Sequence, residues 1–181
     1  VALEKLLSAP TGSASEKTTD GTTVKVEGIP EYSSLTVTEA TDEVKEIVDE
    51  YVAERGKGYT ELFTYDVSVQ DIEGEDWQPD FGVRMELELP GEKLHRYSKV
   101  YVVHVDDNGV ASTIEAEVTE DGKIAFETPG FSTFSGFTVD FEYDGTQFSI
   151  NGMESIKLSE LFEKLKMPLN AEDVSDVSFS N

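Results

Sequence analysis

The residue types that carry most enzyme chemistry are scarce in this chain. It has no cysteine, and its only imidazoles belong to His95 and His104. Without a thiol there can be no thiolate nucleophile, disulfide or cysteine zinc site. A metal site or a catalytic triad around either histidine would need partners that converge from elsewhere in the fold. We therefore interpret both histidines as surface or hydrogen-bonded structural residues, and we predict no catalytic residue, no metal site and no cofactor.

The short motifs typical of catalysis are also missing from the sequence. It contains no Gly-rich phosphate loop, no Gly-x-Ser-x-Gly elbow and no His-Glu-x-x-His helix. Residues 71–76 carry carboxylates at alternate positions, but they lack the length and the fixed Gly and Glu of a calcium loop. Spacing alone cannot place two carboxylates at the separation that a glycosidase needs. We predict an acidic hairpin loop at residues 71–76 and no enzyme activity.

The charge balance excludes two classes of partner. The 181 residues include 38 Asp and Glu against 14 Lys and Arg, which gives a net charge of -24. This excess repels nucleic-acid phosphates and anionic lipid headgroups. The longest aliphatic cluster, residues 100–103, is far shorter than the ~20 apolar residues of a membrane span. We predict no nucleic-acid partner and no membrane contact, and we expect a monomeric segment of a larger chain that carries no signal peptide of its own.

One helix is predicted over residues 41–55. Its apolar residues recur at i, i+3, i+4, i+7 and i+8: Val44, Ile47, Val48, Tyr51 and Val52. Thr41 is available as the N-cap, Asp42 lies in the first turn, and Gly56 follows the last turn. We expect this apolar face to pack against a sheet.

The rest of the chain alternates apolar and polar residues with the period of a strand. The predicted strands are at 22–27, 35–38, 63–69, 83–89, 99–105, 112–118 and 124–128. Asn108-Gly109 predicts a type I′ turn that joins 99–105 to 112–118, and Asp121-Gly122 predicts a second hairpin into 124–128. Many short strands at this spacing favour a mainly β (α+β) protein, a β-sandwich with one packed helix.

Composition divides the chain into three parts. Residues 1–21 are predicted to be the end of a preceding module and a Ser/Thr/Gly-rich linker. Residues 22–137 form the β-sandwich domain with helix 41–55. Residues 138–181 form a small α+β module, a hairpin, a helix at 155–166 and a strand at 174–179, which resembles a β-grasp unit and need not be complete.

Three stretches resemble the β-sandwich modules repeated in large surface proteins of gut Gram-positive anaerobes. They are residues 77–80 (WQPD), 103–109 (VHVDDNG) and 122–134 (GKIAFETPGFSTF). The resemblance covers residues 22–137, and the segment after 138 is similar to a second module of the same architectures. It implies an extracellular place at the cell surface, in a wall-anchored or secreted parent protein. Some such proteins capture host immunoglobulin in the manner of superantigens.

The end of this region also resembles the site of autoproteolytic β-sandwich modules, which cleave themselves between Phe and Ser. In those modules a His before the Phe assists the serine hydroxyl. Gly130 occupies that position here, so cleavage between Phe131 and Ser132 would need a base supplied by the fold. We interpret Phe131, Phe134 and Phe137 as core residues that close the sandwich.

The outer side of the predicted helix is the candidate binding surface. Its residues at helical spacing are Asp42, Glu46, Asp49, Glu50 and Ala53. Such an anionic ridge could steer and orient a basic protein surface, although a charged helix face can also be merely solvated. Trp77 is either an anchor for a ligand or a turn residue packed on the sheet.

These observations predict a non-catalytic module that binds a host protein. The resemblance makes an immunoglobulin variable domain the most specific partner, bound through the helix ridge or an exposed strand edge. The alternative is a structural spacer, a stalk module of a surface adhesin with no ligand of its own.

Overall fold

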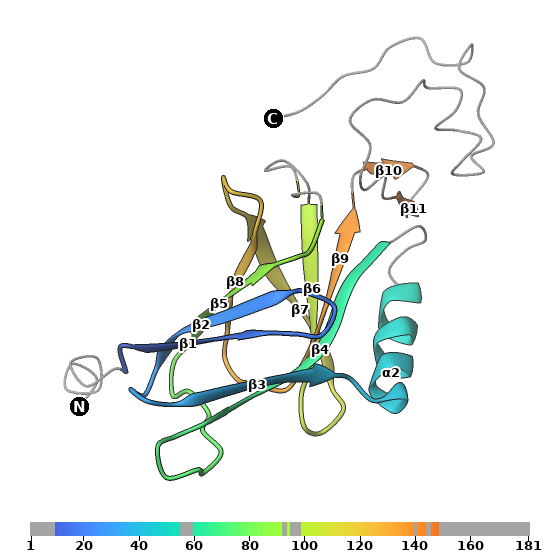
Figure 1. Cartoon of the computed structure of the whole chain (residues 1–181). Helices are drawn as coiled ribbons and strands as arrows, with labels where there is room; N and C mark the ends of the chain where they lie inside the picture. The colour runs from blue at the N-terminus through green and yellow to red at the C-terminus, as the bar shows by residue number, and fades with distance from the viewer. Residues whose placement is uncertain are drawn as a thin grey trace.

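The protein is described by a computed structural model that covers residues 10–54, 60–91, 94, 99–139, 141–143 and 146–148. This part of the chain contains one helix, α2 (Asp42–Ala53) (Figure 1). Its strands are β1 (Gly12–Lys17), β2 (Thr23–Ile29), β3 (Ser34–Glu39), β4 (Thr60–Gln70), β5 (Val83–Glu88), β6 (Lys99–Val105), β7 (Ala111–Val118), β8 (Ile124–Thr128), β9 (Thr133–Val139), β10 (Phe141–Tyr143) and β11 (Thr146–Phe148).

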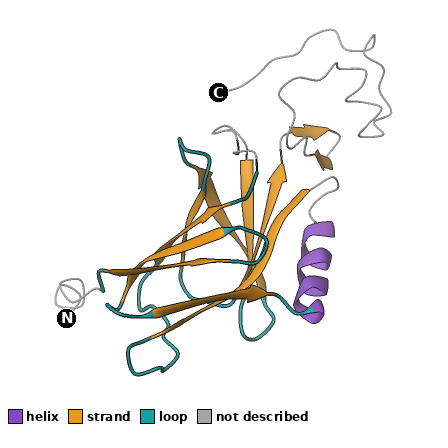
Figure 2. Ribbon diagram, viewed as in Figure 1, coloured by secondary structure: helices purple, strands orange, loops and turns teal. Residues whose placement is uncertain are grey.

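Nine strands form one antiparallel sheet that curls until its two edges come close. Their order is β1-β2-β5-β8-β7-β6-β9-β4-β3, and every neighbouring pair is antiparallel. The α2 helix lies along the outside of this sheet (Figure 2). The mainly β class with a packed helix is therefore confirmed, whereas the sandwich arrangement stays a prediction.

The inward side chains of the sheet make a single large core. Alternate residues of β4 point into it, as the period predicted: Phe63, Tyr65, Val67 and Val69. They meet the alternating residues of β2, β5 and β8, which are Val24, Val26, Val83, Met85, Leu87, Ile124 and Phe126. Gly136 of β9 lies directly under Phe63, since a Cβ built there would be 2.2 Å from the Phe63 ring.

The helix packs on a second, smaller cluster at the outer face of the sheet. Val48 is buried against Val103, Val105 and Phe137, with the other predicted apolar residues of α2 around it. Thr41 has the extended backbone of an N-cap, φ -68° and ψ 157°, but its side chain makes no capping hydrogen bond. The predicted helix and its sheet-facing side are confirmed, and the helix ends at Ala53.

Phe131, Phe134 and Phe137 are all buried core residues, as predicted, but they lie in two different clusters. Phe131 and Phe134 belong to the large core, but Phe137 packs under α2. The reason is geometric: residues 134 and 137 are three apart on β9, so they point to opposite faces of the sheet. Trp77 is partly buried against the large core, with its ring 6.1 Å from that of Phe131.

The hairpin between β6 and β7 forms where predicted, but its turn is not type I′. Gly109 has a φ of 76°, while Tyr32 is the only described non-glycine residue with positive φ. Asp106 Oδ1 accepts hydrogen bonds from the backbone N–H groups of Asn108 and Val110, both at 2.9 Å. This carboxylate keeps Asn108 out of the left-handed region that a type I′ turn requires.

Residues 71–76 repeat the same arrangement. Asp71 Oδ1 accepts from the N–H groups of Glu73 and Glu75, and Gly74 N donates to the Asp71 carbonyl at 3.0 Å. The Asp71 carboxylate therefore serves the turn itself, as the loop prediction implied.

The linker predicted within residues 1–21 is wrong for residues 12–17. They form β1, which pairs along its length with β2. Ser and Gly have little strand propensity, so composition pointed to a linker, and the pairing with β2 overrides it. The predicted strands 22–27 and 35–38 are present as β2 and β3. β2 pairs with β1 and β5, and β3 pairs with β4.

The predicted hairpin after residue 138 is present as β10 and β11, with Phe141 opposite Phe148. The predicted helix at 155–166, the strand at 174–179, the start of the chain and His95 lie outside the described residues.

The two edges of the sheet are joined by side chains. Glu16 Oε2 of β1 accepts a hydrogen bond from Val37 N of β3 at 3.0 Å. In the turn after β1, Asp20 accepts from the hydroxyl groups of Thr18 and Tyr65 and from Thr22 N. Tyr65 lies on β4, so this carboxylate ties the β1–β2 turn to the far side of the sheet.

We predict that Asp20→Asn destabilises the protein at neutral pH. Hydrogen bonds from Thr18, Tyr65 and Thr22 hold the pKa of Asp20 well below its usual range. A lowered folded-state pKa stabilises the fold above the unfolded value of about 4, and this contribution is lost as pH falls. Urea denaturation should show a loss of about 1 kcal/mol at neutral pH, which shrinks below about pH 4.

Asp107→Asn is the matched control, because Asp107 is an exposed turn carboxylate. It should change the free energy of unfolding by less than about 0.5 kcal/mol. Equal losses in the two variants, or a loss for Asp20→Asn that does not depend on pH, would contradict the role of Asp20.

Candidate functional site

The structure brings a serine and a histidine together inside the sheet. His104 lies on β6, and Ser132 immediately precedes β9. These strands are antiparallel neighbours with Val105 opposite Thr133. His104 Nε2 is 2.8 Å from Ser132 Oγ. Both residues are buried, with exposed fractions of 8% and 9%.

Strand alternation explains why His104 faces inward. Val100 and Val102 point into the large core and His104 continues their side of β6. Its ring stacks on Phe134, with 4.7 Å between the ring centroids and 12° between the planes. A buried imidazole without hydrogen bonds would be costly, so the contact with Ser132 also has a structural purpose.

The hydrogen bonds define which group donates. Ser132 Oγ is 2.6 Å from the Val105 carbonyl oxygen, which can only accept, so the hydroxyl donates there. His104 must then donate its Nε2–H to Ser132 Oγ. Burial lowers the pKa of His104, against the opposing effect of the Asp106 and Asp107 charges. The resting state is a neutral imidazole with its proton on Nε2.

Three hydrogen bonds hold the backbone around the Phe131–Ser132 peptide bond, and one of them reaches the carbonyl of that bond. Gln78 Oε1 accepts from Phe131 N at 2.7 Å, and Gln78 Nε2 donates to the Phe131 carbonyl at 2.9 Å. Val67 N of β4 donates to the Ser132 carbonyl at 2.8 Å. The Phe131–Ser132 junction therefore has a nucleophile, a nearby base and a donor on the carbonyl that the nucleophile would attack.

The loop after β4 places Gln78 at this junction. Trp77 N donates to the Val69 carbonyl at 2.8 Å, and the Trp77 ring packs on Phe131. Gly130 leaves room for the Gln78 amide, because a Cβ at residue 130 would lie 3.2 Å from Gln78 Oε1. Thr128 Oγ1 donates to the Gly130 carbonyl at 2.7 Å and fixes the turn that leads to Phe131.

Sequence reasoning missed this cluster. It recognised Phe131 and Ser132 and noted the absent neighbouring histidine, but it did not pair Ser132 with His104 or assign a role to Gln78. The alternation of Val100, Val102 and His104 was a signal that the histidine faces the interior. No comparable pattern in the sequence indicated which strand would pair with β6.

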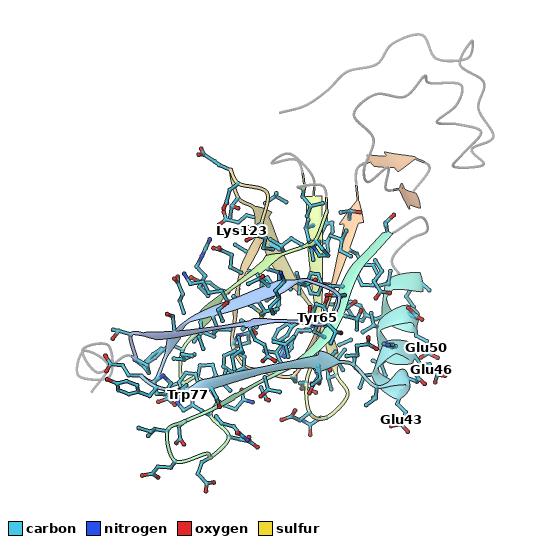
Figure 3. All side chains as sticks on the ribbon, viewed as in Figure 1. Glu43, Glu46, Glu50, Tyr65, Trp77 and Lys123 are labelled. Atoms are coloured by element: carbon cyan, nitrogen blue, oxygen red, sulfur yellow. The ribbon has the colours of Figure 1, made fainter. Side chains whose placement is uncertain are left out.

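The predicted binding surface is exposed as a set. Asp42, Glu46, Asp49, Glu50 and Ala53 all lie on the solvent side of α2. Figure 3 shows Glu43, Glu46 and Glu50 pointing away from the sheet. Lys45 is the one basic residue between the ends of the helix. The ridge is therefore a continuous anionic face, held rigidly by Val48 beneath it.

The described ranges contain no group of three His, Asp or Glu side chains that could hold a metal ion. Nor does any described helix have the length and apolar character needed to cross a membrane. Comparisons with protein-family models, with curated proteins and with solved structures found no match to this chain.

We predict that nuclear magnetic resonance will find His104 neutral at neutral pH, with the proton on Nε2. Its pKa should lie below the usual value of about 6.5, because burial disfavours the charged ring. Since the unfolded state then binds protons more readily, the contribution of His104 to stability falls as pH drops below about 6.5. The His104→Gln spectrum assigns the signal, and a pKa above 6.5 or an Nδ1–H tautomer would contradict the assigned donors.

Proposed function

We propose that this chain is a non-catalytic extracellular module of a bacterial cell-surface protein and that it binds a host protein. The proposed partner is an immunoglobulin variable domain, and the proposed contact surface is the outer face of α2. The resemblance of residues 22–137 to sandwich modules of surface proteins supports this context. We also propose that the curled sheet divides into two packed layers, as in a sandwich. The observation that carries the proposal is the exposed anionic ridge of α2.

Electrostatics explain how the ridge would act. Four carboxylates on one rigid helix face create a local negative potential, which attracts a basic surface and orients it during encounter. The effect acts mainly on the association rate and weakens with salt. The buried side of the helix need not move, because Val48 already packs on Val103 and Val105.

Biolayer interferometry against pooled immunoglobulins tests this function. We expect saturable binding at micromolar concentration or below. The variant Asp42→Asn, Glu46→Gln, Asp49→Asn, Glu50→Gln should weaken binding by about tenfold or more, chiefly through slower association. The same number of exposed carboxylates outside α2 provides a matched control: Glu31→Gln, Glu73→Gln, Glu75→Gln and Glu120→Gln.

The control should bind within about twofold of the wild type, apart from a general effect of net charge. No signal at micromolar concentration would remove immunoglobulin as the partner and favour the spacer function. Equal weakening in both variants would remove the ridge as the contact surface.

A second function, self-cleavage between Phe131 and Ser132, is favoured by the contact between Ser132 and His104. In this reaction Ser132 Oγ attacks the Phe131 carbonyl carbon while its proton passes to His104 Nε2. The C–N bond then breaks, and His104 returns the proton to the released amine of Ser132. Water hydrolyses the resulting ester, leaving a carboxylate on Phe131 and a free hydroxyl on Ser132. The net reaction consumes one water molecule.

The resting hydrogen bonds restrain this reaction. The Ser132 hydroxyl points to the Val105 carbonyl, and His104 presents a proton rather than a lone pair. The serine must rotate and the imidazole must change its tautomer before proton transfer can occur. We therefore expect slow, single-turnover processing rather than rapid cleavage.

Intact mass measured over several days at mildly alkaline pH tests self-cleavage. We expect two fragments, one ending at Phe131 and one beginning at Ser132, and we expect Ser132→Ala to stay intact. Ser132→Thr is the control, because it keeps a hydroxyl at the same position. A wild-type chain of undiminished mass, in the presence or absence of hydroxylamine, would exclude this function.

A further inference from the structure

We infer that Gln78 is a catalytic residue of the Phe131–Ser132 junction, where its amide stabilises negative charge on the carbonyl oxygen. This inference rests on the self-cleavage proposed above and assigns the group that the Ser132–His104 pair lacks. A serine and a base supply the nucleophile and move the proton, but neither stabilises the oxyanion that forms when the carbonyl is attacked.

The orientation of the Gln78 amide is determined by its partners. Phe131 N is a donor and must face Oε1, at 2.7 Å, while the Phe131 carbonyl is an acceptor and must face Nε2, at 2.9 Å. A flipped amide would place a donor against the donor at Phe131 N and an acceptor against the acceptor at the Phe131 carbonyl. The N–H donor is thus fixed on the oxygen where charge would develop.

The surroundings hold this amide in place. Its neighbour Trp77 is anchored through its backbone to Val69 and through its ring to Phe131. Gly130 is close enough to Gln78 Oε1 that a side chain at residue 130 would press on the amide. A histidine at residue 130 would therefore crowd the Gln78 amide, with its Cβ about 3.2 Å from Gln78 Oε1.

Solvent access to the junction is uneven in a way that suits hydrolysis. His104 and Ser132 are buried, whereas Gln78 is exposed. Protein thus covers the bond on the His104 side, and the exposed Gln78 residue lies on the side from which water would enter. The second step needs such a water to attack the ester.

The substitution Gln78→Glu tests this role. A carboxylate still accepts from Phe131 N, but it replaces the donor on the Phe131 carbonyl with an acceptor. Loss of one such donor lowers the rate of an acyl-transfer reaction by about a hundredfold to a thousandfold. The readout is the first-order rate of fragment formation, measured by mass with and without hydroxylamine to trap the ester.

Gln70→Glu is the matched control, because it makes the same change at an exposed glutamine at the end of β4, whose side-chain amide donates to Asp76 rather than to Phe131. Gln78→Met, which removes both amide bonds at similar size, should lose the rate as Gln78→Glu does. Thermal unfolding of each variant separates a rate effect from a loss of structure. We expect the control to cleave within about tenfold of the wild type and to unfold at nearly the same temperature as the wild type, because Gln70 is exposed.

The outcomes separate the two proposals. A wild-type chain that never cleaves and yields no hydroxylamine product overturns self-cleavage and the role of Gln78 with it. A wild-type chain that cleaves while Gln78→Glu cleaves at a similar rate overturns the role of Gln78 alone. Equal rate losses in Gln78→Glu and Gln70→Glu also overturn it.

Discussion

A carboxylate and a backbone N–H join the two open edges of the sheet. In the described part of the chain, β1 and β3 are not neighbours in the backbone hydrogen-bonding pattern of the sheet. Instead, Glu16 accepts a hydrogen bond from β3 and Asp20 accepts one from Tyr65 of β4. The inward residues of β2, such as Val24 and Val26, are fully buried in the large core over which these contacts close. An unpaired edge invites association with other strands, and a carboxylate on the edge N–H discourages it.

The interior closed in this way is mainly apolar, and it contains a buried histidine–serine pair where β6 meets β9. His104 and Ser132 satisfy each other there, and the same contacts that remove the cost of burial also align a nucleophile with a base. A structural pair and a reactive one differ in the direction of the Ser132 hydroxyl and in the tautomer of His104. The pairing of β6 with β9 thus places His104 beside the Phe131–Ser132 bond, at which we propose self-cleavage.

Much of the local structure could be predicted from the sequence. The period of α2 and the alternation on β4 follow from side-chain direction alone, and Asn108-Gly109 marked the β6–β7 hairpin. The turn type was wrong because the Asp106 carboxylate outweighs the intrinsic preference of Asn-Gly. β1 was missed because its stability comes from pairing with β2 rather than from its own residues.

The candidate site could be predicted only in part, because its members come from separate elements. Phe131 and Ser132 were visible as a pair, but His104 reaches them through the β6–β9 pairing and Gln78 through a loop anchored on β4. Such long-range pairing depends on the total packing of the sheet. No spacing along the chain encodes it directly.

The repeated turn design has a consequence for how the surface can vary. In the loops at Asp71 and Asp106, a single side chain and a left-handed glycine three residues later fix the path of the backbone. The two residues between them, such as Asp107 and Asn108, contribute little to that path. These positions can exchange side chains without shifting strand register, so the molecule offers loop tips that could diversify or accept grafted recognition sequences while its framework stays constant.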